Sequence, residues 1–256
     1  MVINRPHSKL KSLLILILLS FVACPALAFI NIESLRQIDG KGYLGQTTLQ
    51  VSGQQGNTDK FTSQASTMGV YRLDINEWLY TASYKYGTSA NVRDTNLGSG
   101  HIRHTWNYQE PIAYEAFIQS GFDEFKRLNS RNYVGGNLRF RLLHSEDNRL
   151  YAGTGAFYEV EDFEGQDEDT EGLRGNIYIS HVARLNETVT SSTTIYYQPK
   201  FKDLENYRLR FMTGLDVRIN ETLSLDVDFN LVNDSGLPEG VKQTDIDYLV
   251  GFSVKY

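Results

Sequence analysis

Hydrophobic and polar residues alternate one by one near the C-terminus. From Ile246 to Tyr256 the even positions are apolar or aromatic, and most odd positions are polar or charged. In residues 223–231 the phase is reversed, with Leu, Val and Phe at odd positions. A period of two places the two sets on opposite faces of a strand. Weaker alternation recurs in residues 78–87, 133–142 and 173–185, and no long segment has a helical period. The pattern predicts an all-β chain.

The connections between these segments also repeat. Short polar turns are centred near residues 76, 109, 146, 186 and 220, and Arg184–Thr188 nearly duplicates Arg218–Thr222. Longer polar connections lie between the short turns, at Gly53–Asp59, Asn91–Asn96, Lys126–Arg131, Glu164–Thr170, Lys202–Asn206 and Asn233–Thr244. The spacing predicts twelve antiparallel strands between Gly42 and Tyr256, each longer than the roughly 5–6 residues usual in soluble sheets.

Long strands with opposite apolar and charged faces favour a transmembrane barrel. Only a closed sheet satisfies every backbone group of an all-strand protein in lipid. Aromatic residues lie near both strand ends, such as Trp78 and Trp106 near the short turns and Phe61 and Phe122 near the longer loops, as in membrane-interface belts. We therefore predict an up-and-down antiparallel barrel over residues 42–256, with short periplasmic turns and longer extracellular loops. A soluble β-sandwich would also alternate and is the alternative.

The first 28 residues have the features of a secretory signal peptide. Arg5, Lys9 and Lys11 precede the apolar run Ser12–Ala23, and Ala26–Ala28 supplies a small-x-small cleavage pattern. The apolar run is shorter than the roughly 20 residues that span a bilayer. We predict cleavage after residue 28, which leaves 29–41 as a periplasmic segment before the barrel. A retained anchor helix is the alternative.

Charge and cysteine content narrow the function further. The signal peptide carries three of the 25 Lys and Arg and none of the 31 Asp and Glu, so the remaining chain has a formal charge of −9. This excess argues against a nucleic-acid partner, which needs a basic surface. Cys24 is the only cysteine, so a disulfide scaffold is excluded. Phe21–Cys24 loosely resembles a lipoprotein box, which makes lipid attachment at Cys24 a second possibility.

The polar strand faces predict a charged lumen. Residues of both signs fall on these faces, and Asp226 and Asp228 are expected to pair with arginines of the preceding strand. Twelve strands enclose more space than the eight whose side chains fill a small barrel. The lumen is thus either an ion-paired filling or a narrow pore. The candidate lumen-lining residues are Arg139, Arg141, Arg174, Arg208, Arg210, Arg218, Asp226, Asp228, Glu115 and Asp123.

The last strand has a further feature. Its apolar residues are Tyr248, Val250, Phe252, Val254 and Tyr256. A final strand of this kind that ends in an aromatic residue resembles the signal read by the outer-membrane barrel-assembly machinery.

The order of several short motifs resembles that of a known family. Val51–Asp59 resembles the SGNTD-type loop of the salt-induced outer membrane proteins, with an extra Gln-Gly, and Asn206–Arg210 and Ile219–Leu225 match further pieces. The resemblance covers essentially the whole chain after the signal peptide. It implies a twelve-strand barrel in the Gram-negative outer membrane and no catalytic residues.

Few residues offer other chemistry. No two of the four histidines after the signal peptide form a metal pair on one strand face; they are His101, His104, His144 and His181. His104 with Ser120, or His101 with Glu115 or Asp123, could instead serve a barrel phospholipase or protease. The acidic residues between 159 and 171 could bind Ca²⁺, bridge divalent ions to lipopolysaccharide or form a solvated loop.

We therefore expect a structural barrel or narrow channel for small solutes or ions, with a contribution to salt tolerance by resemblance. A barrel enzyme and a surface-binding protein are the alternatives. Expected partners are outer-membrane lipid, lipopolysaccharide and the assembly machinery, with no metal or cofactor.

Overall fold

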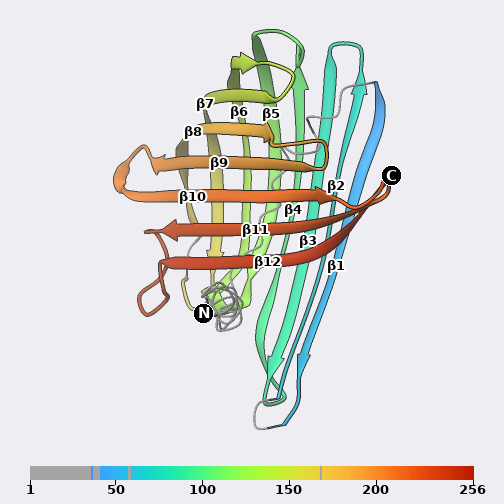
Figure 1. The fold of residues 1–256 in the computed structure, drawn as a ribbon. Coiled ribbons are helices and arrows are strands. Elements are labelled where there is room, and N and C mark those ends of the chain that lie inside the picture. Colours follow the sequence, from blue (N-terminus) through green and yellow to red (C-terminus); the bar gives the residue numbers. More distant parts are fainter. Residues whose placement is uncertain (1–35, 37–40, 57–58, 168) are drawn as a thin grey trace, which may run out of the picture.

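The computed structural model is a closed barrel of twelve antiparallel strands (Figure 1). It describes Arg36 and residues 41–56, 59–167 and 169–256. The expected signal peptide, its cleavage site, Cys24 and most of the segment 29–41 lie outside the described residues. Within the described part of the chain, no helix has the length and apolar character needed to cross a membrane.

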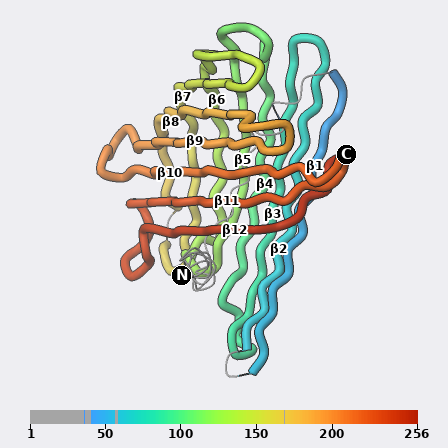
Figure 2. Tube along the Cα trace, viewed as in Figure 1, coloured from blue at the N-terminus to red at the C-terminus, as the bar shows by residue number. Residues whose placement is uncertain are grey.

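Each strand pairs with its neighbours in sequence, and β1 pairs with β12 to close the ring (Figure 2). This order confirms the predicted up-and-down barrel. The strands are β1 (Gly42–Gln54), β2 (Lys60–Leu73), β3 (Asn76–Ser89), β4 (Val92–Trp106), β5 (Ile112–Asp123), β6 (Leu128–His144), β7 (Asn148–Phe163), β8 (Thr170–Arg184), β9 (Val189–Lys200), β10 (Asp203–Arg218), β11 (Leu223–Asp234) and β12 (Thr244–Lys255), with the 3₁₀ helix η2 (Glu124–Lys126) between β5 and β6.

The barrel has an apolar outside and a polar inside. Leu49, Val250 and Phe252 point outward and are 67%, 64% and 57% exposed. Among the described residues, buried polar and charged side chains outnumber buried hydrophobic ones. A soluble protein buries its apolar residues instead. This inversion, which follows from the alternation along each strand, is the arrangement of a barrel that faces lipid.

Three of the predicted longer loops are wrong, because strands continue through them. Residues 92–96 belong to β4, residues 128–131 to β6 and residues 203–206 to β10. The β3–β4 connection is only Ala90 and Asn91, and both have a positive φ, as a tight two-residue hairpin turn requires. Polar composition indicated loops at these places, whereas the residues are the outer ends of long hairpins.

The seam between β1 and β12 is the shortest strand pairing. Its pairing joins Gln46–Leu49 to Phe252–Lys255, and Gly45 and Tyr256 exchange two backbone hydrogen bonds of 2.7 and 3.0 Å. The side-chain amide of Gln50 donates to a backbone carbonyl of β12 at 3.0 Å. The other neighbouring strands pair over nine or more residues.

Aromatic rings cover glycines at this seam and elsewhere. A side chain at Gly45 would collide with the rings of Tyr256 and Tyr43, and Gly69 lies in the same way under its cross-strand partner Tyr80. Glycine therefore lets an aromatic ring lie flat against the strand.

We expect Gly45→Val to lower the free energy of unfolding by about 1–3 kcal/mol, because the added side chain would push Tyr256 from the seam. Gly53→Val on the same strand is the control, since open space surrounds Gly53. Urea unfolding of the purified barrel in lipid vesicles measures both. Equal stability of the two variants would show that the ring contact does not hold the seam.

Candidate functional site in the lumen

The lumen has two ends, which differ in their connections. We call the end with the β2–β3, β4–β5, β6–β7, β8–β9 and β10–β11 connections the turn end, and the opposite end the loop end. Three groups of inward side chains lie at different depths of the lumen: a charged cluster towards the loop end, a central glutamate, and a basic vestibule at the turn end.

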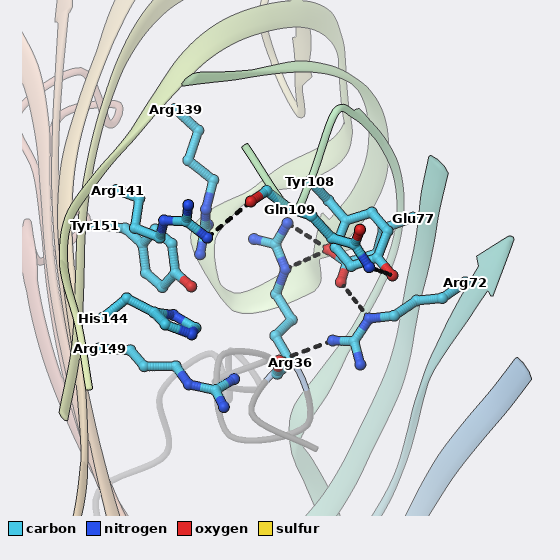
Figure 3. A pocket seen from close by; sticks show the side chains of 10 residues that line it. All are labelled: Arg36, Arg72, Glu77, Tyr108, Gln109, Arg139, Arg141, His144, Arg149 and Tyr151. Atoms are coloured by element: carbon cyan, nitrogen blue, oxygen red, sulfur yellow. Dashed lines mark hydrogen bonds and ion pairs between the residues drawn. The ribbon is translucent and has the colours of Figure 1, made fainter. Parts of the chain in front are cut away.

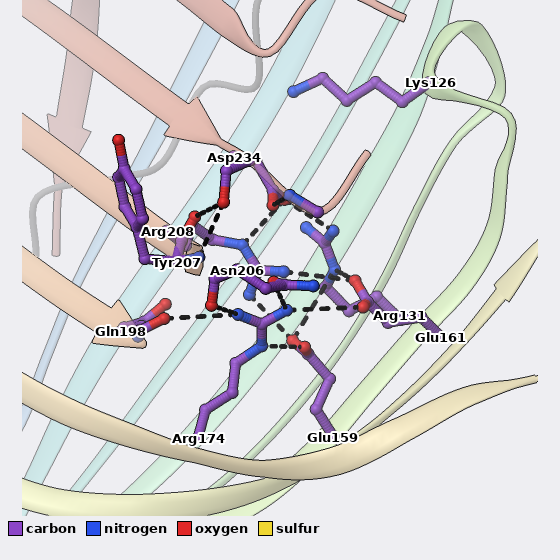
Figure 4. Close-up of polar contacts among 12 residues, drawn as sticks. Lys126, Arg131, Glu159, Glu161, Arg174, Gln198, Asn206, Tyr207, Arg208 and Asp234 are labelled. Atoms are coloured by element: carbon purple, nitrogen blue, oxygen red, sulfur yellow. Dashed lines mark hydrogen bonds and ion pairs between the residues drawn. The ribbon is translucent and has the colours of Figure 1, made fainter. Parts of the chain in front are cut away.

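The cluster towards the loop end consists of three arginines and three carboxylates (Figure 4). We call it the arginine–carboxylate cluster, and its members are Arg131, Arg174, Arg208, Glu159, Glu161 and Asp234. Arg208 is fully buried, and its guanidinium contacts Glu159 at 2.8 Å, Asp234 at 2.9 Å and Glu161 at 3.2 Å. Equal numbers of each sign and multiple hydrogen bonds offset the desolvation of the six charges.

This cluster crosses the barrel. Arg131 on β6 contacts Asp234 on β11 at 2.8 Å, although the two strands are five positions apart in a ring of twelve. Lys126 in η2 reaches Asp245 on β12 at 2.5 Å in the same half of the barrel. Side chains alone therefore bridge opposite walls of the lumen towards the loop end.

Glu115 is the centre of the second group. Its fully buried carboxylate accepts hydrogen bonds from the Tyr178 hydroxyl at 2.9 Å and the Asn137 amide at 3.1 Å. Arg103 donates to both of its oxygens at 3.4 Å. Next to this group, Phe117 packs with two other inward aromatic rings. The middle of the lumen is thus packed with both polar and aromatic side chains.

Arg36 precedes the barrel in sequence but lies inside it. Its guanidinium donates to Glu77 at 2.6 Å and to the Thr105 hydroxyl at 3.0 Å, and contacts Glu115 at 3.5 Å. Arg72 donates to Glu77 at 2.9 Å and to the backbone carbonyl of Arg36 at 2.8 Å. A residue from before β1 is therefore held in the lumen by buried ion pairs.

A cavity of about 310 Å³ opens beside Arg36 at the turn end (Figure 3). We call this cavity the vestibule. Two tyrosines contact its guanidinium groups: Arg139 lies 3.8 Å from the ring centre of Tyr151 and Arg72 lies 5.5 Å from that of Tyr108. The charged residues that line it are Arg36, Arg72, Arg139, Arg141, Arg149 and Glu77. The arrangement is suited to anions.

Comparison with known proteins places the chain in a family. A family model described as "Protein of unknown function, DUF481" matches residues 48–256. The chain belongs to the DUF481 family. No curated protein matches this DUF481 chain.

Solved structures of outer-membrane barrels have a similar fold. The NanC porin is 13% identical with a TM-score of 0.52, and the match covers 83% of this chain and all of that one. The KdgM porin in complex with disordered oligogalacturonate is 8% identical (TM-score 0.49, covering 84% and 99%). The translocator domain of the autotransporter NalP from Neisseria meningitidis is 11% identical (TM-score 0.49, covering 88% and 91%).

The candidate lumen residues of this DUF481 barrel occupy different depths. Arg139, Arg174, Arg208, Arg210, Glu115 and Asp226 are buried inside, and Asp228 is half-buried. Three others lie towards the ends. Arg141 is at the vestibule, Asp123 caps η2 by accepting from two backbone N–H groups, and the exposed Arg218 donates to the backbone carbonyl of Glu187.

The expected pairing of Asp226 and Asp228 with arginines of β10 is wrong. The strand register places Asp226 opposite Asp216 and Asp228 opposite Gly214. Asp226 instead accepts from Gln46 across the seam at 3.2 Å, and Lys255 contacts Asp216 at 2.7 Å. The arginines of β10 face other residues of β11 in this register: Arg208 faces Asp234, Arg210 faces Val232 and Arg218 faces Ser224.

The histidines considered for alternative chemistries bond amide side chains. His104 bonds Asn76 at 2.9 Å, whereas Ser120 donates to Asn132 at 2.7 Å, so they do not form a hydrolase pair. His101 bonds Gln119 at 3.1 Å. Within the described ranges, no three His, Cys, Asp or Glu residues are grouped to hold a metal ion.

The acidic segment 159–171 begins inside the barrel. β7 runs to Phe163, so Glu159 and Glu161 lie in a strand and bind arginines of the cluster. They do not belong to a solvated loop.

Several important residues were missed from the sequence. Arg131 and Asp234 fell in predicted loops, yet each lies an even number of residues from inward-facing residues of its own strand. The same holds for Arg149, which shares odd numbering with the inward Glu159 and Glu161 of β7. Extending that parity by a few residues would have found all three. Arg36 has no comparable sequence signal.

The apolar residues of the last strand all face outward. Tyr248, Val250, Phe252, Val254 and Tyr256 are exposed on the barrel surface. Their recognition by assembly machinery stays a prediction.

We expect Arg208→Gln to lower the free energy of unfolding by about 3–5 kcal/mol, because three buried carboxylates would lose their shared cation. Arg184→Gln removes the same charge at an exposed position and should change stability by at most about 0.5 kcal/mol. Denaturant titration in lipid vesicles gives both values. An Arg208→Gln barrel as stable as the control would mean that the cluster contributes little to stability.

Proposed function

We propose that this protein is an outer-membrane barrel that forms a narrow channel for small ions or solutes. The fold shared with a small porin and the apolar outer surface support this reading. The expected signal peptide would direct export. On this proposal lipid and lipopolysaccharide contact the outer face, the assembly machinery inserts the chain, and the protein is not an enzyme.

The proposal rests on the way in which side chains cross the lumen. Charged side chains of the barrel wall cross the lumen in the loop half, and a cavity of about 310 Å³ lies at the turn end. Arginine and glutamate side chains exchange partners without any change of backbone. A rearrangement of the arginine–carboxylate cluster, together with a shift of the side chains packed around Glu115, would therefore connect the cavity to the other side of the membrane.

A narrow, charge-lined channel is also compatible with the resemblance to salt-induced outer membrane proteins. A restrictive lumen would admit ions slowly while the barrel remains stable in the membrane. We propose a contribution to osmotic or salt tolerance on this ground.

We expect the double variant Arg131→Ala/Asp234→Ala to conduct several-fold more than the unchanged protein in a planar bilayer. The substitutions remove the contact that crosses the lumen without changing the net charge. Purified protein in molar potassium chloride, recorded one channel at a time, gives the measurement.

The control is Arg93→Ala/Glu124→Ala, which removes an exposed ion pair of 2.7 Å at the loop end. Its conductance should equal that of the unchanged protein. Absence of conductance from all three proteins would refute the channel proposal, and equal increases in both variants would refute the role of the cluster.

A further inference from the structure

We propose that the vestibule is a binding site for a small polyvalent anion, a molecule with two or more carboxylate or phosphoryl groups. The inference goes beyond the proposed channel function, because a ligand could bind here whether or not the barrel conducts. It rests on the charges, the geometry and the size of the cavity.

The lining charges are strongly unequal. Five arginines but only one carboxylate, Glu77, line the cavity among the residues that the structure describes. Glu77 is also engaged already, by Arg36 at 2.6 Å and Arg72 at 2.9 Å. The vestibule differs in this respect from the arginine–carboxylate cluster, where each sign is equally represented. A second carboxylate, Glu115, lies behind this lining, 3.5 Å from Arg36 and 3.6 Å from Arg139, so arginines still outnumber carboxylates around the cavity among the described residues. A predominantly basic cavity attracts anions.

Three of the five arginines gather on one side of the cavity. Figure 3 shows Arg139, Arg141, His144, Arg149 and Tyr151 on the side away from Glu77. They come from the β6–β7 hairpin, whose register shifts between Arg141 and Leu143. Residues 141 and 144 would point to opposite faces of a regular strand, and this bulge lets both line the vestibule.

The same groups are held in position before any ligand arrives. Arg141 donates to the backbone carbonyl of Gln109 at 2.8 Å, and the Arg139 guanidinium lies over the ring of Tyr151. A guanidinium presents paired N–H donors that match two oxygens of a carboxylate or phosphoryl group. Several fixed guanidinium groups in one cavity thus favour a ligand with several such groups, because little further ordering is required on binding.

The size and position limit the ligand. A volume of about 310 Å³ is near the lower end of the roughly 300–1,000 Å³ usual for small-molecule sites. The side chains around Glu115 and the arginine–carboxylate cluster lie between the vestibule and the loop end, so the turn end is the shorter route for a ligand. One compact di- or trianion fits these conditions better than a long polymer.

Isothermal titration calorimetry of the purified full-length barrel in a non-ionic detergent tests the proposal. Pyrophosphate is the phosphoryl probe, citrate the carboxylate probe and glucose the uncharged control. We expect saturable binding of at least one anion and no binding of glucose. The anion that binds more tightly identifies whether the site prefers a phosphoryl or a carboxylate group. Failure of both anions to bind at millimolar concentration would overturn the proposal and leave the channel function untouched.

A matched pair of variants locates the site. Arg141→Gln/Arg149→Gln should weaken anion binding by about tenfold or more, because charge-assisted hydrogen bonds are lost. Arg184→Gln/Arg218→Gln removes the same charge at exposed positions near the turn end that do not line the vestibule, and should leave the affinity unchanged. Equal weakening in both variants would mean diffuse attraction by surface charge and would overturn the site.

Buried Arg149 makes a folding control necessary. Heat-dependent gel mobility, which distinguishes folded from unfolded barrels, is measured for each variant. If the double variant does not fold, Arg141→Gln alone provides the same test, since Arg141 is only partly buried. Unchanged affinity in a folded Arg141→Gln barrel would contradict the assignment.

Discussion

A sheet surrounded by lipid can leave no backbone donor or acceptor on an open edge, since no water is present to satisfy it. Closure of the ring follows from this requirement, and closure fixes which side chains face the lumen. Because twelve strands enclose a space wider than small side chains can fill, long side chains must cross it. Arg131 and Arg208 have the reach to meet carboxylates on other walls, and the polar face of each strand supplies both signs.

The two halves of the lumen use the same residue types differently. In the arginine–carboxylate cluster towards the loop end, arginines and carboxylates match in number, so charge is cancelled locally and side chains bridge the walls. At the turn end arginines are in excess and an open volume is left. We infer that the first arrangement stabilises the barrel and that the second attracts anions. Glu115 lies between them, bonded to residues from β6 and β8.

The alternation of apolar and polar residues predicted the fold well, because the pattern within each strand indicates which of its residues face outward and which face the lumen. Phe252 and Arg208 face outward and inward as the parity of their strands requires. Strand ends were less predictable: residues 92–96 and 203–206 are polar, and composition alone does not distinguish a loop from a hairpin that extends beyond the membrane.

Lateral contacts were the hardest to predict. The partner of Asp226 depends on register and on side chains that cross the seam, and neither is encoded in one strand. The position of Arg36 depends on the three-dimensional path of a segment with no alternating pattern.

The seam between β1 and β12 has a consequence for how the molecule is made. Thr47 and the Tyr256 hydroxyl are bonded across it although they are 209 residues apart in the chain. All the other strand pairs join strands that are consecutive in sequence, so each can form as a hairpin as soon as its second strand is available. The β1–β12 pair instead needs the first and the last strand together. Its formation must therefore complete the cylinder, and because it has the fewest backbone pairs it is also where the wall is easiest to part.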